Sequence, residues 1–147
     1  MCGIAGWFQL EVAKVERLPL LRRMCETIRH RGPDDQGFYV DDRVGLGIQR
    51  LSIVDLAGGH QPMAAADGSI QVVFNGEIYN HAALREELRR AGVSFRTVSD
   101  TEVILRLYER EGLRGFERMN GMFGVAVWDC RDATPSHPNL QQSLVRQ

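Results

Sequence analysis

The segment Met122–Trp128 constrains the fold more than any other, because it is a continuous apolar run in a chain of mixed polarity. A short run of this kind is typical of a strand that is buried on both faces. Further extended segments are expected at residues 3–8, 38–40, 44–49, 51–56, 70–74 and 93–98. Apolar spacing predicts helices at 18–28, at 81–91 and from a capping box at 99–102 up to Gly112, with a short helical turn over 113–119. Strands in pairs with helices between them predict an α+β layered domain.

The composition is that of an ordinary globular domain. The 147 residues are 44% hydrophobic and 25% charged, which is enough for one domain with one core. A formal net charge of -1 gives no electrostatic case for nucleic acid or an anionic membrane as a partner. No apolar run approaches the roughly 18 residues that span a bilayer, and the start of the chain lacks the pattern of a signal peptide. We therefore expect a cytoplasmic protein with no nucleic-acid or membrane partner.

The cysteines point to a free thiol rather than to a disulfide framework or a metal site. Cys2, Cys25 and Cys130 are few and widely spaced, and the four histidines show no ligand spacing, so we expect no metal. Cys2 follows the initiator Met1, whose removal would leave a thiol and a free α-amine on one carbon. An α-amine titrates near pH ~8 and is therefore available as the base that activates the thiol. The alternative is that Cys2 is a small residue without a role.

Asn75 and Gly76 directly follow a predicted strand and have two interpretations. Asn-Gly is a strong signal for a tight hairpin turn. The same pair also suits an oxyanion hole, in which a side-chain amide and a backbone N–H converge on one oxygen. Arg50 has the planar fork that binds a carboxylate at two points, and Glu77 and Asp100 suit an ammonium group. Each of these three also has a structural explanation: a solvated arginine, a surface charge, and an acidic residue at a helix N-terminus.

Taken together, the motifs resemble the glutaminase domain of the class II glutamine amidotransferases, most closely that of the glutamine-hydrolysing asparagine synthetases. In the family's order they are MCGIAGWF at 1–8, RHRGPDDQG at 29–37, RLSIVD at 50–55 with GHQPM at 59–63, FNGEIYN at 74–80, SDTEVIL at 99–105 and MNGMFGVAVWD at 119–129. The superfamily also includes the amidotransferases that make glucosamine 6-phosphate and phosphoribosylamine, but residues 49–55 are more similar to the asparagine synthetase branch.

The resemblance implies an N-terminal nucleophile hydrolase fold, a four-layer αββα sandwich with antiparallel sheets. It also implies that Cys2, after removal of Met1, attacks the side-chain amide of L-glutamine to give glutamate and ammonia. The remaining roles are oxyanion donors at Asn75 and Gly76, a carboxylate ligand at Arg50, ammonium ligands at Asp100 and Glu77, and a backbone lining from Leu51, Ser52, Ile53 and Val54. Asn75 would then be a turn residue as well as an oxyanion donor.

The chain departs from the family pattern at two places. Ile48 stands where the family often has His, and we expect it to be a core residue. Residues 130–147 match no part of the family and are polar, so we predict a disordered or weakly attached tail. We therefore divide the chain into a glutamine amidotransferase type 2 domain at 1–129, which we expect to lack its last strands, and an unmatched tail at 130–147.

The predicted function is glutamine hydrolysis as the ammonia-supplying half of an asparagine synthetase. This reaction needs no cofactor. The resemblance places ATP and Mg in a synthetase domain, which we expect to be absent because the chain has no Gly-rich phosphate-binding motif. A separately encoded synthetase domain is a candidate partner. The alternatives are an inactive, truncated remnant that binds glutamine or another protein, and the glutaminase domain of an amidotransferase with a different acceptor.

Overall fold

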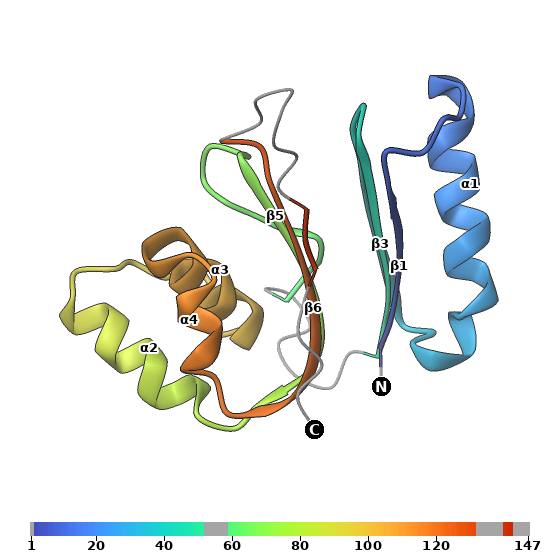
Figure 1. Cartoon of the computed structure of the whole chain (residues 1–147). Coiled ribbons are helices and arrows are strands. Elements are labelled where there is room, and N and C mark those ends of the chain that lie inside the picture. Colours follow the sequence, from blue (N-terminus) through green and yellow to red (C-terminus); the bar gives the residue numbers. More distant parts are fainter. Residues whose placement is uncertain (1, 52–58, 132–139, 143–147) are drawn as a thin grey trace.

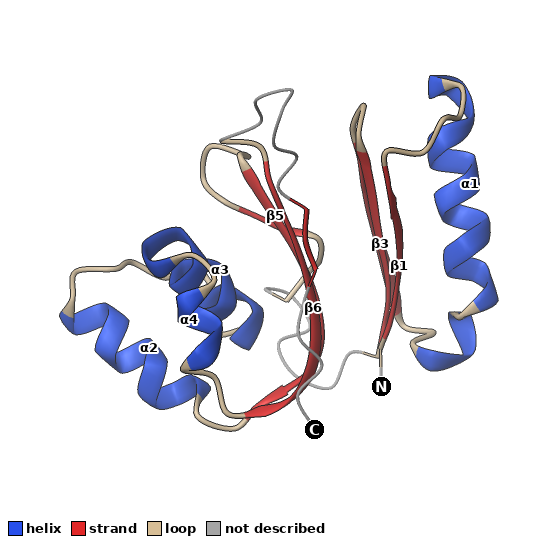
Figure 2. Cartoon of the chain, in the orientation of Figure 1, coloured by secondary structure: helices blue, strands red, loops and turns tan. Residues whose placement is uncertain are grey.

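The computed structural model describes residues 2–51, 59–131 and 140–142. Two sheets lie face to face, and helices cover the outer face of each, so the elements form four layers (Figure 1 and Figure 2). All strand pairs in the described ranges are antiparallel. This arrangement confirms the expected α+β class and the αββα order of layers.

The first sheet has the strand order β1-β3-β2 and is covered by one helix. Its elements are β1 (Gly3–Phe8), β2 (Asp35–Val40), β3 (Val44–Arg50), the helix α1 (Lys14–Thr27) and the 3-10 turn η1 (Arg29–Arg31). A Cβ added at Gly47 would overlap the Sγ of Cys25. Glycine at this position of β3 therefore lets α1 pack directly against the sheet.

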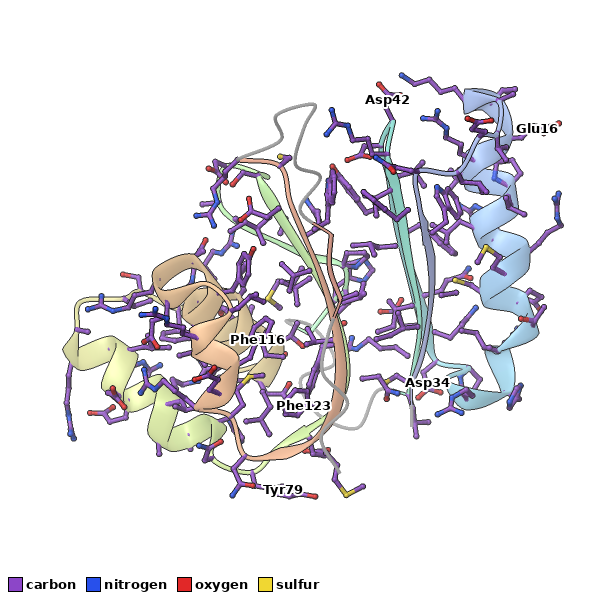
Figure 3. The ribbon with its side chains drawn as sticks, in the orientation of Figure 1. Glu16, Asp34, Asp42, Tyr79, Phe116 and Phe123 are labelled. Atoms are coloured by element: carbon purple, nitrogen blue, oxygen red, sulfur yellow. The ribbon has the colours of Figure 1, made fainter. Side chains whose placement is uncertain are left out.

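The second sheet has the order β4-β5-β6-β7, and three helices cover it. Its elements are β4 (Met63–Ala64), β5 (Ile70–Ile78), β6 (Gly121–Asp129), β7 (Leu140–Gln142), α2 (His81–Arg90), α3 (Asp100–Glu111) and α4 (Arg114–Glu117). Figure 3 shows Phe116 and Phe123 in the layer between these helices and the sheet, whereas Tyr79 lies at the edge of the molecule. Phe116 and Phe123 belong to the larger of two buried apolar clusters.

The smaller apolar cluster joins the two sheets. Ile48 from β3 packs with Val73 from β5 and Trp128 from β6, and Cys2 and Phe8 lie partly buried against this cluster. Ile48 is fully buried, as expected for a core residue. Since alternate residues of β6 belong to the two clusters, both faces of this strand are covered, in agreement with its continuous apolar sequence.

Some local expectations are wrong. The segment 93–98 is not a strand. The side chain of Glu102 accepts hydrogen bonds from the backbone N–H groups of Arg96 and Thr97, and Arg85 donates to the backbone O of Thr97 and of Ser99. These side chains take the backbone groups that a sheet partner would use. The expected hairpin turn at Asn75-Gly76 is also wrong, because both residues lie inside β5.

Part of the C-terminal segment is ordered as a strand. Leu140–Gln142 pair with Ala126, Val127 and Trp128 at the edge of β6. These three residues therefore form β7 rather than the unordered structure expected for them, because the edge of β6 offers free backbone partners. The expected extended segment at 51–56 falls almost entirely on residues 52–58, which lie outside the described residues. The division of the chain at residue 129 stays a prediction.

Candidate active site

Cys2 lies immediately before β1 and is held beside the end of β3. Its Sγ lies 3.4 Å from the backbone N of Leu51, which donates to it, and 3.9 Å from the backbone O of the same residue. Arg31 donates from Nε to the backbone O of Cys2 at 3.2 Å. The cysteine is partly buried. The thiol is thus fixed at the mouth of the space between the two sheets and remains accessible.

Asn75 and Gly76 occupy the middle of β5, where they face Gly124 and Phe123 of β6. The strand pairing with β6 is continuous from Ile70 to Ile78, so β5 runs through the Asn-Gly pair without interruption. Gly76 has φ +146°, a backbone conformation that side chains rarely adopt, and an added Cβ would overlap the backbone of β6. The glycine is therefore required by the strand pairing itself, and Asn75 is not a turn residue.

A pocket of about 250 Å³ brings most of the predicted site residues together. The predicted residues that line it are Cys2, Arg50, Leu51, Asn75, Gly76, Glu77 and Asp100. They come from the residue before β1, the end of β3, the second half of β5 and the start of α3. Ser52, Ile53 and Val54 lie outside the described residues. Four separate parts of the chain thus contribute polar groups to one concave site.

Arg50 is a buried cation at the end of β3. Its side chain is 7% exposed, and its Nη1 lies 3.5 Å from Oδ2 of Asp35. The two residues face each other across β2 and β3. The same Oδ2 lies 3.1 Å from Nδ1 of His60. Asp35 therefore anchors the guanidinium at the pocket, a role that the sequence signals only through its place in the RHRGPDDQG motif.

The acidic side of the pocket is formed by Glu77 from β5 and Asp100 from α3. Burial raises the pKa of the Asp100 carboxyl, and the nearby charge of Glu77 raises it further. The helix start itself is fixed by Ser99, whose side chain accepts from the backbone N of Thr101 at 3.2 Å. A cation beside these two carboxylates would therefore stabilise the charged form of Asp100.

Several residues line the pocket without a role having been predicted for them from the sequence. They are Gln61, Phe74, Tyr79, His81, Val98, Ser99, Thr101 and Met122. Gln61 is 4% exposed, and its side chain bonds to both β5 and α3. The available signal was its position inside the GHQPM motif, where a polar residue precedes a proline. His81 has a buried Nδ1 without a hydrogen-bond partner among the described residues.

Across residues 2–51, 59–131 and 140–142, no three His, Cys, Asp or Glu residues are grouped so that they could hold a metal ion. In this described part of the chain, no helix has the length and apolar character needed to cross a membrane.

The four-layer sandwich is also found in a solved amidotransferase. A structural neighbour is the glutamine phosphoribosylpyrophosphate amidotransferase of Bacillus subtilis, complexed with ADP and GMP, with a TM-score of 0.64. The likeness covers 88% of this chain and 35% of the neighbour at 19% sequence identity, so it shows the fold alone. The fold is that of the N-terminal nucleophile hydrolase amidotransferases, as expected.

The sequence then defines the family. The glutamine amidotransferase domain model matches residues 1–136, and the chain belongs to this family. It is 43% identical over 131 residues to the glutamine-hydrolysing asparagine synthetase 2 of Bacillus subtilis, covering 88% of this chain and 17% of that relative. It is 41% identical over 129 residues to asparagine synthetase B of Escherichia coli, covering 88% of this chain and 23% of that relative. The chain thus spans about a fifth of the length of these relatives and is homologous to their glutaminase part.

Proposed function

We propose that this chain hydrolyses the side-chain amide of L-glutamine to glutamate and ammonia, with the thiolate of Cys2 as the nucleophile. The observation that carries this proposal is the pocket that Cys2 shares with Asn75, Gly76 and two carboxylates. A thiol beside two potential oxyanion donors suits acyl transfer. A guanidinium and two carboxylates in the same pocket suit the carboxylate and the ammonium of an α-amino acid.

The reaction starts when removal of Met1 frees the α-amine of Cys2. This amine takes the thiol proton through water, and Sγ bonds to the amide carbon while the carbonyl electron pair moves to oxygen. The Asn75 amide and the Gly76 N–H donate to this oxyanion. Loss of one such donor typically costs ~2.7–4 kcal/mol of transition-state stabilisation. The C–N bond then breaks, and ammonia leaves with the returned proton.

Water completes the cycle by adding to the thioester, which breaks the S–C bond, releases glutamate and restores the thiol. During both steps Arg50 holds the substrate carboxylate, and Asp35 keeps the guanidinium in place. Asp100 and Glu77 hold the ammonium, which relieves the repulsion between their charges. All groups used in these steps belong to the chain, to the substrate or to water, so the proposed chemistry needs no metal or cofactor.

We also propose how this activity is used. The identity of about 40% to asparagine synthetases supports a role as the ammonia-supplying part of such an enzyme. ATP and Mg would act in a synthetase domain, which we propose as a separately encoded partner. We propose that the amidotransferase unit spans residues 1–129 and that the protein acts in the cytoplasm. Asparagine formation on mixing the chain with a synthetase domain, ATP and glutamine tests this acceptor.

The direct test is glutamate release by the purified chain. Cys2→Ala should abolish release, whereas Cys130→Ala should leave it unchanged, since Cys130 is an exposed thiol that does not line the pocket. Intact mass establishes in each sample that Met1 has been removed. Equal release by the wild type and Cys2→Ala would overturn the proposal. Tight binding of glutamine without any release would favour the alternative of an inactive glutamine-binding protein.

A further inference from the structure

The side chain of Gln61 connects two walls of the pocket. It is 4% exposed, its Oε1 accepts from the backbone N of Phe74 at 2.6 Å, and its Nε2 donates to Oγ1 of Thr101 at 3.2 Å. Phe74 immediately precedes Asn75, and Thr101 immediately follows Asp100. One buried amide therefore spans from the strand of the oxyanion donors to the helix start of the ammonium ligand.

The position of Gln61 follows from where β4 stops. The β4–β5 ladder pairs Met63 with Val72, so an antiparallel continuation would place residue 61 opposite Phe74. The Gln61 side chain supplies the acceptor for Phe74 N in place of a strand backbone. Its own backbone packs against β2, where a Cβ at Gly37 would overlap the Gln61 carbonyl.

We propose that Gln61 is a positioning residue that sets the distance between the oxyanion donors on β5 and the ammonium ligand Asp100 on α3, and thereby the length of the amide substrate. This inference rests on the proposed glutamine hydrolysis. In the proposed reaction the amide oxygen of the substrate is bound by β5 and its α-amine by Asp100 of α3 together with Glu77, so the separation of β5 and α3 selects the number of methylenes. Neither partner of Gln61 is itself one of the proposed substrate ligands, so it acts through their neighbours.

A primary amide meets both demands at this site without adding charge. Its carbonyl accepts from Phe74 N, and its NH₂ donates to Thr101. Gln61→Met keeps length and burial but leaves the Phe74 N–H without its acceptor and cuts the connection to α3. A misplacement of about 1 Å at a catalytic group can cost 10²-fold in rate. A loosened pocket should therefore lose rate on glutamine and lose discrimination against shorter amides.

The experiment compares Gln61→Met, Thr101→Val and Thr101→Ser with the wild-type chain. We expect kcat/KM for glutamine to fall about 10²-fold in Gln61→Met, with kcat and KM both affected. Thr101→Val removes only the hydrogen bond that Gln61 donates to α3, and kcat/KM should fall about tenfold, mostly through KM. Thr101→Ser keeps the hydroxyl and should have the wild-type values. The ratio of kcat/KM for L-glutamine to that for L-asparagine should shrink in Gln61→Met and Thr101→Val.

Two further measurements keep the outcomes separate. Thermal melting shows whether Gln61→Met folds. If Gln61→Met fails to fold, the kinetics of Thr101→Val alone test the positioning role. Glutamine affinity by calorimetry tests positioning without turnover. If the wild type hydrolyses glutamine and Gln61→Met and Thr101→Val match it in rate and in discrimination, the positioning role is overturned and the proposed function stands. If the wild type binds glutamine without hydrolysing it, the proposed function fails, and unchanged affinity in both variants overturns the positioning role.

Discussion

Replacing Glu102 by Gln should destabilise the chain strongly, because this carboxylate organises the segment before α3. Glu102 is fully buried. Its two oxygens accept from the backbone N of Arg96, from the backbone N and Oγ1 of Thr97, and from Nη2 of Arg106, at 2.7 to 3.1 Å. These bonds outweigh the desolvation that burial causes, and they lower the pKa of Glu102 below its usual value.

The magnitude follows from what an amide loses at this site. If the NH₂ group replaces Oε2, the Thr97 N–H loses its acceptor, and if it replaces Oε1, the Arg106 guanidinium faces another donor. An unsatisfied buried donor costs about 1–3 kcal/mol, and bonds to a charged group are worth about twice those to a neutral one. We therefore expect a loss of about 3 kcal/mol, a large part of a typical domain stability of about 5–15 kcal/mol.

Urea unfolding followed by circular dichroism measures this loss as a lower midpoint at an unchanged slope. The matched control is Glu109→Gln, which removes a carboxylate from the same Arg106 at 2.8 Å but at a site that is 25% exposed. The control should lose under about 1 kcal/mol. Since the pKa of Glu102 is lowered on folding, its contribution is full above the unfolded-state pKa and is lost as pH falls through the folded-state pKa. A loss below about 1 kcal/mol in Glu102→Gln, or one equal to the control, would refute this reasoning.

Three other outcomes are expected. Gly76→Ala should lower stability by about 1–3 kcal/mol in thermal melts, because the new Cβ overlaps β6. In the control Gly124→Ala the new Cβ meets nothing within 4 Å, so stability should change by at most about 0.5 kcal/mol. Equal effects of the two substitutions would contradict the strand geometry. Burial raises the pKa of Cys25 to about 11, so iodoacetamide at pH about 8 should modify the exposed Cys130 and spare Cys25 in peptide mass maps, and labelling of both would count against this packing. Because the pKa of Asp100 is raised in the free pocket, glutamine affinity should fall as pH drops through that pKa. Calorimetry at a pH near that pKa should show that glutamine binding releases protons. Proton release that persists in Asp100→Asn would exclude Asp100 as its source.

Local sequence patterns were sufficient to predict the elements whose apolar spacing matches the period of a strand or a helix. The strand at residues 3–8 and the helix that begins after Ser99 were both expected, and the structure contains them as β1 and α3. β6 was recognised because a strand covered on two faces needs an unbroken apolar sequence. In these cases the information that determines the element lies within a few neighbouring residues of the sequence.

Long-range partners account for the failures. Asn75-Gly76 favours a turn locally, but nine consecutive pairs with β6 hold these residues in a strand. The segment 93–98 has strand-like residues, yet its backbone groups are bound by Glu102 and Arg85 from two helices. Gln61 has a buried amide whose partners lie 13 and 40 positions away. None of these contacts leaves a periodic signal in the sequence.

The walls of the pocket come from Cys2, the end of β3, β5 and the start of α3, so residues that are about a hundred positions apart in the sequence must meet before the pocket exists. Contacts of such large sequence separation are closed late, after the local helices and hairpins have formed. Recovery of the proposed glutamine site after dilution from denaturant is therefore a stricter measure of native structure than recovery of the helical circular dichroism signal. A refolding chain should regain its circular dichroism first and its glutamine affinity last.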